Sequence, residues 1–82
     1  MIDVLYFASL RERVGLRRER IETQATTVGA LIDELAARDE AHALAFEDRR
    51  AIRAAVDQEL AEADTLLAGA REVAFFPPMT GG

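Results

Sequence analysis

The chain opens and closes on short runs rich in β-branched and aromatic residues. Residues 2–7 have the sequence IDVLYF and residues 72–76 have the sequence EVAFF. Runs of this length and composition, with polar residues spaced among the apolar ones, predict strands. Further strands are predicted around Ile21 and over residues 52–56, the latter followed by a turn at residues 57–58. We therefore expect four or five strands.

The middle of the chain has a helical periodicity instead. Its apolar residues recur at intervals of three and four, as one stripe of a helix requires: Val28, Leu31, Ile32 and Leu35. Thr26 and Thr27 precede this stripe and can cap the helix with a hydroxyl oxygen. Residues 9–15 predict a short helical turn or loop that ends at Gly15. Residues 39–49 predict a short helix or an irregular segment that covers the core.

The order strand, strand, helix and strands defines the fold class. It predicts an α+β fold in which one main helix packs across one face of a mixed sheet. If the first and last strands are neighbours, they run parallel at the centre of the sheet, which suits their high apolar content. Residues 1–76 then form one domain, and residues 77–82 form an extended tail.

Side-chain alternation assigns the two faces of the first and last strands, because successive residues of a strand point to opposite sides. The core face is predicted to hold Ile2, Val4, Tyr6, Val73 and Phe75. The other face is marked as polar by Asp3 and Glu72, yet it also carries Leu5, Phe7 and Phe76. These apolar residues either form an exposed docking patch or lie under loops or the segment 41–48. The sequence leaves both interpretations open.

Composition narrows the classes of partner and compartment. The formal net charge is −5 and the pI is about 4.8, so nucleic acid is not expected as a partner, while a partner protein with a basic patch is. The chain has no cysteine and no lysine. It therefore offers neither a thiolate nor a lysine amine for catalysis, and the lack of cysteine suits a reducing cytoplasm. We expect no membrane segment, because the apolar runs are only a few residues long.

Conventional catalytic groups are scarce. The sequence holds one serine, Ser9, and one histidine, His42, and a nucleophile-elbow motif does not surround Ser9. We expect His42 to be a surface residue rather than a base or a metal ligand. The acidic pairs at 39–40 and 47–48 are interpreted as solvated or helix-end charges. We therefore expect no metal site and no catalytic site in the chain itself.

The last six residues have a different chemical character. Gly81 and Gly82 carry no side chains, so this end can enter a narrow channel and adopt backbone angles closed to other residues. Pro77 and Pro78 restrict the backbone just before it and direct the tail away from the sheet. Fully extended, residues 77–82 span about 20 Å. The pattern predicts a stiff exit that ends in a thin reactive tip.

The sequence FFPPMTGG at residues 75–82 resembles the C-terminal signature of the small sulfur-carrier subunits of molybdopterin synthase, a ubiquitin-like β-grasp family. The stretches MIDVLYFASLRERVG, TVGALIDELAAR and AIRAAVDQEL are similar to that family's opening strand, helix and later strand and turn. Four positions depart from its usual pattern. They are Asp57, where asparagine is frequent, Met79, where a branched aliphatic residue is usual, and the pair at 70–71 after the turn glycine.

The resemblance implies a β-grasp fold and a mechanism centred on Gly82. A ubiquitin-activating-type adenylyltransferase would use ATP to adenylate the Gly82 carboxylate, and a sulfur donor protein would convert the adenylate to a thiocarboxylate. The tail would then enter the large catalytic subunit, where sulfur passes to cyclic pyranopterin monophosphate. Beyond ATP consumed by that partner, the resemblance implies no bound cofactor. It assigns tail access to Pro77, Pro78, Met79, Thr80 and Gly81. We select Phe7, Leu60 and Phe76 as docking residues.

Three other functions share features with this one. A related β-grasp sulfur carrier for thiamine synthesis or tRNA thiolation would end in the same two glycines, although FFPP is not expected there. A ubiquitin-like modifier would join Gly82 to lysines of target proteins. A plain interaction module would leave the tail inert.

Overall fold

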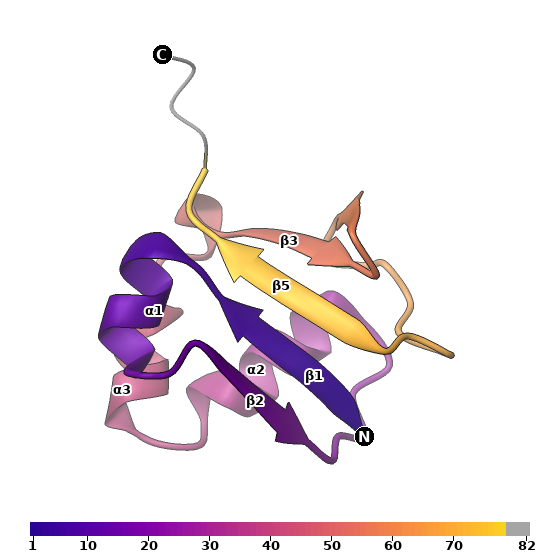
Figure 1. The fold of residues 1–82 in the computed structure, drawn as a ribbon, viewed down its shortest axis with the longest axis horizontal. Helices are drawn as coiled ribbons and strands as arrows, with labels where there is room; N and C mark the ends of the chain where they lie inside the picture. The colour runs from indigo at the N-terminus through magenta and orange to yellow at the C-terminus, as the bar shows by residue number, and fades with distance from the viewer. Residues whose placement is uncertain (79–82) are drawn as a thin grey trace.

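Five strands form one mixed sheet in the computed structural model, which describes residues 1–78 of the chain. The strands are β1 (Ile2–Tyr6), β2 (Arg18–Ile21), β3 (Arg53–Val56), β4 (Glu59–Ala61) and β5 (Glu72–Phe76). They lie in the order β2-β1-β5-β3-β4 (Figure 1). β1 and β5 run parallel at the centre, and the remaining pairs are antiparallel. The predicted central pairing of the first and last strands is confirmed, as is the α+β fold class.

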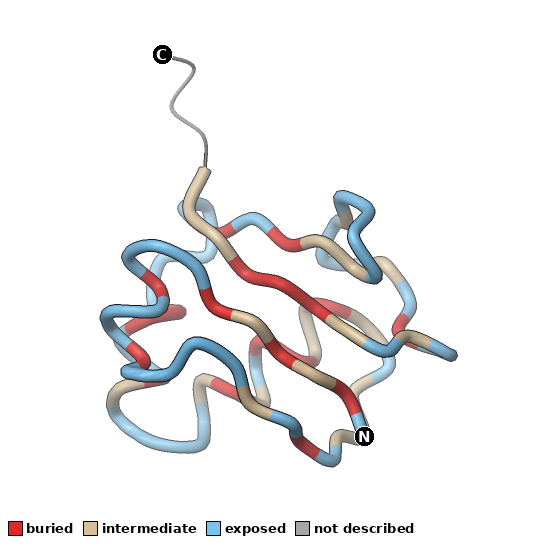
Figure 2. Tube along the Cα trace, viewed as in Figure 1, coloured by how far each residue is buried: buried red, intermediate tan, exposed pale blue. Residues whose placement is uncertain are grey.

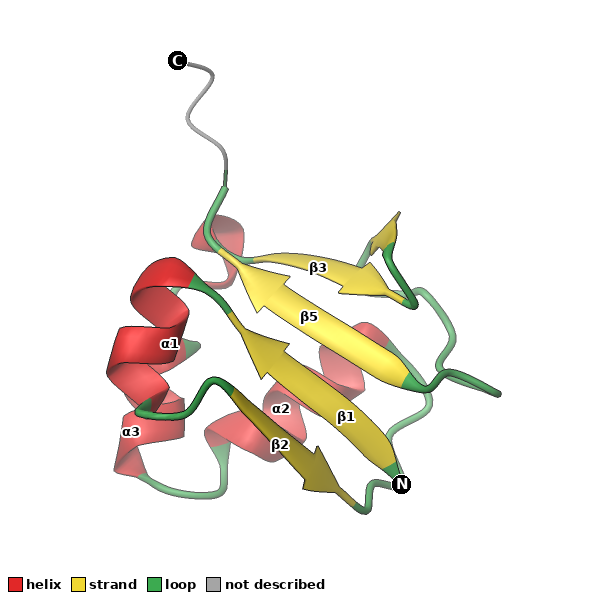
Figure 3. Cartoon of the chain, viewed as in Figure 1, coloured by secondary structure: helices red, strands yellow, loops and turns green. Residues whose placement is uncertain are grey.

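One long helix crosses the back of the sheet, as the periodicity predicts. This helix is α2 (Val28–Ala36), and the Thr27 hydroxyl accepts a hydrogen bond from the Ala30 N–H at its first turn. Two shorter helices, α1 (Ala8–Val14) and α3 (Glu40–Ala45), stack at one end of the sheet (Figure 3). A 3-10 turn, η1 (Arg49–Ala51), precedes β3. Among the helices of residues 1–78, none combines the length and apolar composition of a bilayer-spanning segment.

The first strand is one residue shorter than predicted. β1 ends at Tyr6, and Phe7 follows in an extended conformation as the N-cap of α1, with its N–H donating to the Phe75 carbonyl oxygen. Phe7 therefore still lies beside the end of β5, although it belongs to the connection rather than to the strand. Gly15 ends α1 in the left-handed region, at φ 88°, where the absence of Cβ removes the steric cost.

The core lies between the sheet and the helices. Val4, Tyr6, Val73 and Phe75 from the two central strands are almost completely buried, and they alternate with more exposed residues along β1 (Figure 2). The ambiguous segment 39–49 contributes Phe46, whose ring meets that of Phe75 edge-on at 5.1 Å. The prediction that segment 39–49 covers the core is therefore confirmed, and this segment packs on the helix side of the sheet.

Asp57 connects the β3–β4 hairpin to the start of β5. Asp57 and Gln58 both have positive φ, the requirement of the two-residue turn that best matches strand twist. One carboxylate oxygen of Asp57 accepts the N–H groups of Arg71 and Glu72, both at 3.0 Å. This turn side chain thus satisfies the last backbone donor before β5 and the first one within it. Asparagine at this position could accept the same bonds through its amide oxygen.

Replacing Asp57 with alanine is expected to lower the free energy of unfolding by about 2 kcal/mol, because two backbone donors lose their acceptor and alanine tolerates positive φ poorly. Asp57→Asn retains an acceptor and the tolerance for positive φ, so we expect a loss below about 1 kcal/mol. Urea denaturation of both variants measures the difference. A loss in Asp57→Ala as small as that expected for Asp57→Asn would show that the carboxylate does not anchor β5.

Candidate functional site

The face of the sheet opposite α2 is free of helices in the described part of the chain (Figures 1 and 3). Strand register and alternation assign its side chains, and we call this surface the open face. Its residues are Asp3, Leu5, Arg18, Arg20, Arg53, Ala55, Leu60, Glu72, Ala74 and Phe76. Ala74 illustrates that the open face is distinct from the core on the other side of the sheet: it is only 8% exposed, yet it does not belong to the core cluster. The segment 41–48 lies on the other side, so it does not cover these residues.

An apolar row crosses the centre of the open face. Leu5 of β1 pairs with Ala74 of β5, Ala74 pairs with Ala55 of β3, and Ala55 pairs with Leu60 of β4. Small alanines in the two middle strands keep the row flat, and Leu60 is 80% exposed at its outer end. An exposed leucine continuous with other apolar positions is typical of an interaction surface.

The last strand divides its two phenylalanines between the faces. Phe75 is fully buried in the core, whereas Phe76 lies on the open face and is partly buried. Phe7 follows Tyr6, the partner of Phe75, and is 45% exposed. Phe7 and Phe76 therefore stand at the end of the sheet from which the tail departs. The predicted assignment of Phe75 to the core and Phe76 to the opposite face is confirmed.

The tail leaves the sheet directly after Phe76. Pro77 and Pro78 are partly buried and belong to no regular element. Because proline has no N–H, the pair cannot extend the hydrogen-bonded ladder of β5. The predicted roles of Met79, Thr80, Gly81 and Gly82 lie outside the described residues and stay predictions.

Two arginines of β2 share one carboxylate on the open face. Asp3 accepts hydrogen bonds from Arg18 at 3.2 Å and from Arg20 at 2.9 Å. The Arg20 hydrogen bond holds the pKa of Asp3 below its ordinary value. Both arginine side chains remain largely exposed, so the pair adds little stability. It does leave positive charge at the β2 edge of the face.

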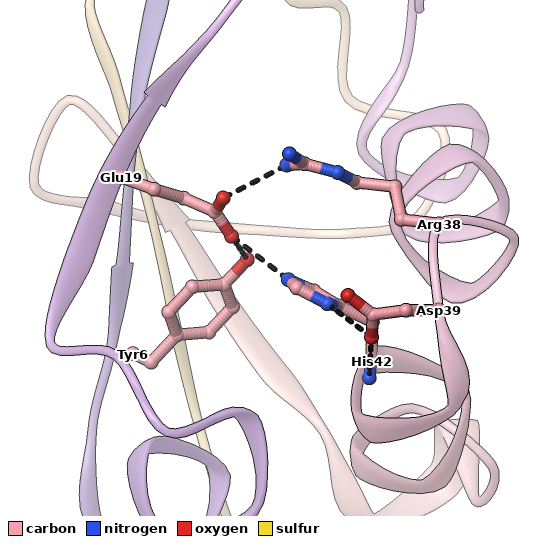
Figure 4. Close-up of polar contacts among 5 residues, drawn as sticks. All are labelled: Tyr6, Glu19, Arg38, Asp39 and His42. Carbon is pink, nitrogen blue, oxygen red and sulfur yellow. Dashed lines mark hydrogen bonds and ion pairs between the residues drawn. The ribbon is translucent and has the colours of Figure 1, made fainter.

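His42 is not the surface residue that the sequence predicted. It is 4% exposed and forms the centre of a polar cluster on the helix side of the sheet (Figure 4). Its Nε2 lies 2.8 Å from a Glu19 oxygen and its Nδ1 lies 2.8 Å from an Asp39 oxygen. The same Glu19 oxygen accepts the Tyr6 hydroxyl, and the other Glu19 oxygen accepts Arg38. The prediction failed because Glu19 is distant in sequence and reaches His42 only once β2 has paired with β1.

The geometry of the cluster favours a doubly protonated His42. Ionised carboxylates can only accept hydrogen bonds, so both ring nitrogens must donate. Burial alone would lower the pKa of His42, but the hydrogen bonds to Glu19 and Asp39 outweigh it and raise that pKa above its ordinary value. Burial opposes ionisation of Glu19 as well, yet hydrogen bonds from Tyr6 and His42 lower its pKa overall. The pKa of Asp39 is lowered first by the backbone N–H of His42 and then by its ring.

This cluster ties the helices to the sheet and takes no part in a hydrolytic site. Both nitrogens of His42 are occupied, so the ring cannot deprotonate Ser9, which lies exposed on α1. Asp39 also caps α3, and Asp48 caps η1, as predicted for helix-end charges. Within residues 1–78, no group of three or more candidate ligands is arranged to hold a metal ion.

The raised pKa of His42 predicts a stability that falls as the pH rises. A protonated histidine stabilises the folded state fully below its unfolded pKa, about 6.5, and this contribution is lost as the pH passes through the higher folded pKa. The ring is surrounded by Glu19, Asp39, Arg38 and Tyr6. The pKa values of Glu19 and Asp39 are lowered and that of Tyr6 is raised, so these three groups titrate outside the pH range in which His42 loses its proton. We therefore expect a lower free energy of unfolding at pH 9 than at pH 6.

His42→Gln is the variant that tests this account. It should lower the free energy of unfolding by about 1–3 kcal/mol at pH 6, because a buried charged hydrogen bond to Glu19 is lost. It should also flatten the dependence of stability on pH between 6 and 9. Chemical denaturation at several pH values gives both quantities. A variant that keeps the wild-type slope would show that another group titrates.

Comparisons with known proteins agree with this geometry. The chain is 46% identical to the molybdopterin synthase sulfur carrier subunit of Escherichia coli over 82 residues, covering all of both chains. It is 35% identical to the protein of that name from Haemophilus influenzae, again over all of both chains. The crystal structure of small archaeal modifier protein 1 from Haloferax volcanii superimposes with a TM-score of 0.72 at 29% identity, covering 95% of this chain and 97% of that one.

A mixed five-stranded sheet with a parallel central pair, crossed by one long helix, defines the ubiquitin-like β-grasp class. The match to the ThiS family model spans residues 4–82, from the first strand through Gly82. The chain belongs to the ThiS family.

Proposed function

We propose that the protein is the sulfur carrier subunit of a molybdopterin synthase. The observation that carries this proposal is the identity of 46% to the Escherichia coli protein of that name over the whole length of both chains. The sequence FFPPMTGG supports it, because this stretch begins in a central strand of the sheet and has no side chains at Gly81 and Gly82. A carrier needs a group that two different partners can reach.

The chemistry that we propose takes place on the Gly82 carboxylate. A carboxylate is a poor electrophile, so an adenylyltransferase partner first joins it to the AMP portion of ATP and releases pyrophosphate. Hydrosulfide supplied by a sulfur donor protein then attacks the acyl carbon, expels AMP and leaves a thiocarboxylate. In the large subunit the thiocarboxylate sulfur bonds to cyclic pyranopterin monophosphate, and water cleaves the acyl–sulfur bond and restores the Gly82 carboxylate. All catalytic side chains in this scheme belong to the partners.

The chain contributes presentation rather than catalysis. The open face offers an apolar row that ends in Leu60, and it adjoins the tail exit at Phe7 and Phe76. A partner that binds this face would meet the tail at a defined position relative to its own channel. Pro77 and Pro78 restrict the backbone at that exit, which reduces the conformational freedom lost on insertion.

Reconstitution with the large subunit tests the proposal. Thiocarboxylated protein, the large subunit and cyclic pyranopterin monophosphate should together yield molybdopterin, with the thiocarboxylate returned to carboxylate. Unmodified protein serves as the control and should yield none. Formation of a tight complex without any product would count against the sulfur carrier role.

A second candidate function is protein modification. It is favoured by the likeness to the Haloferax volcanii protein, whose name describes a modifier. In that function Gly82 would form an isopeptide bond with lysines of other proteins, and chains of the protein on itself could not form because it has no lysine. Digests of whole-cell protein would then contain lysines carrying the C-terminal residues of this chain. If such modified lysines are absent in cells that make molybdopterin, protein modification is ruled out and the carrier function remains.

A further inference from the structure

The open face carries positive charge although the protein as a whole is acidic. Its charged residues are three arginines and two carboxylates, a formal charge of +1, in a chain whose formal net charge is −5. The excess of carboxylates therefore lies on the helix side and around the edges. The overall charge led us to expect a basic patch on the partner, but the face beside the tail does not favour one.

The positive charge stands on both sides of the apolar row. On the β2 side, Arg18 and Arg20 share the carboxylate of Asp3, so one positive charge is not balanced within that group. The other carboxylate of the face, Glu72, pairs with Asp3 across the strands and stands at the opposite end of β5 from Phe76. Their side chains are 65% and 69% exposed, so both remain accessible to a partner. On the β3 side stands Arg53, three strand positions away from β2 in the sheet. At the usual strand spacing the two positions are about 14 Å apart across the strands, and the offset of two residues between Arg18 and Arg53 along the strands adds to this separation.

Arg53 stands next to the tail exit. It pairs across the strands with Phe76, the last residue of β5. Its one side-chain hydrogen bond within residues 1–78 is a long contact of 3.5 Å to the Arg50 carbonyl oxygen, and no carboxylate of that range lies within ion-pair distance. A guanidinium of this kind can still form a bidentate pair with a carboxylate.

We infer that the large subunit of the proposed synthase meets the open face with an apolar patch flanked by carboxylates, one opposite Arg53 at the mouth of the tail channel and one opposite the Arg18–Arg20 pair. This inference rests on the proposed function. Two separated charge contacts fix the rotation of the partner on the face, which a flat apolar row of leucines and alanines cannot do alone. Charge complementarity of this type mainly raises the association rate and specificity.

The test measures binding of the full chain to the large subunit at low and high salt. Arg53→Glu should weaken binding by about 10-fold at low ionic strength, mainly through slower association, and the loss should shrink in 1 M salt, where screening acts within about 3 Å. Arg18→Glu should behave similarly. The matched control is Arg13→Glu, which changes the net charge equally but lies beside Leu44 and Glu47 on the helix side. Thermal unfolding verifies that all three variants fold.

The outcomes separate this inference from the proposed function. If Arg53→Glu and Arg13→Glu change the affinity equally, or if Arg53→Glu binds more tightly, the inference that carboxylates flank the apolar patch of the partner is wrong. If the wild-type chain binds the large subunit here and delivers sulfur in the reconstitution with cyclic pyranopterin monophosphate, the proposed function stands regardless. If the wild-type chain neither binds nor delivers sulfur, both fail.

Discussion

Deletion of Gly82 is expected to abolish sulfur loading while leaving the free energy of unfolding unchanged. The deletion moves the terminal carboxylate back by one residue, about 3.5 Å of extended chain. Displacements of even 1 Å at a reacting centre can cost about 100-fold in rate, so we expect at least that loss in thiocarboxylate formation. Adding one alanine after Gly82 should have a similar effect, because it moves the carboxylate forward and introduces a side chain.

Met79→Val is the matched control for these two variants. It keeps the length of the tail and introduces the branched aliphatic residue that is usual in the sulfur-carrier family that the tail resembles. It should therefore be loaded with sulfur like the wild-type chain. Loading is measured by intact mass, and stability by urea denaturation. A Gly82 deletion that is loaded normally would show that the sulfur is carried elsewhere. A deletion that unfolds the domain would assign the tail a structural role.

Leu60→Arg is expected to weaken binding to the large subunit by about 100-fold with a change in unfolding free energy below about 0.5 kcal/mol. Leu60 is 80% exposed, so its substitution removes almost no core packing. Placing a charge on the apolar row would bury that charge without a partner against the apolar patch of the large subunit, and an unpaired buried charge costs several kcal/mol. Calorimetric titration with the large subunit gives the affinity.

Leu44→Arg is the control for this prediction. Leu44 is also an exposed leucine, 53% accessible, but it belongs to α3 on the other side of the sheet. It should bind the partner normally. Phe76→Arg should weaken binding too, although its partial burial predicts some loss of stability as well. If Leu44→Arg and Leu60→Arg reduce the affinity equally, the open face is not the docking surface.

The parts of the fold that could be predicted are those governed by local periodicity. Alternation in the two central strands separated Phe75 from Phe76, because Asp3 and Glu72 marked the opposite face. The helical stripe of α2 needed no knowledge of distant residues. The chemistry proposed for the tail could also be inferred from the sequence, since it depends on the identity of the residues and not on their packing, and it stays a prediction.

The parts that could not be predicted depend on contacts between distant segments. His42 is buried because Glu19, 23 residues away, turns inward from β2 and the Tyr6 hydroxyl needs the same acceptor. The net charge likewise did not predict the charge of the open face, because a sum over the chain does not say where each charge lies. Arg18, Arg20 and Arg53 come together on one surface only through the order of the strands.

The most direct test of the central claim is the intact mass of the wild-type chain after incubation with the adenylyltransferase, ATP and a sulfur donor. ATP-dependent release of pyrophosphate in the same reaction establishes that the activating enzyme is competent. We predict a mass increase equal to the exchange of one oxygen for one sulfur, assigned to Gly82 by fragmentation. An unchanged mass while pyrophosphate is released would contradict the proposal that this protein carries sulfur.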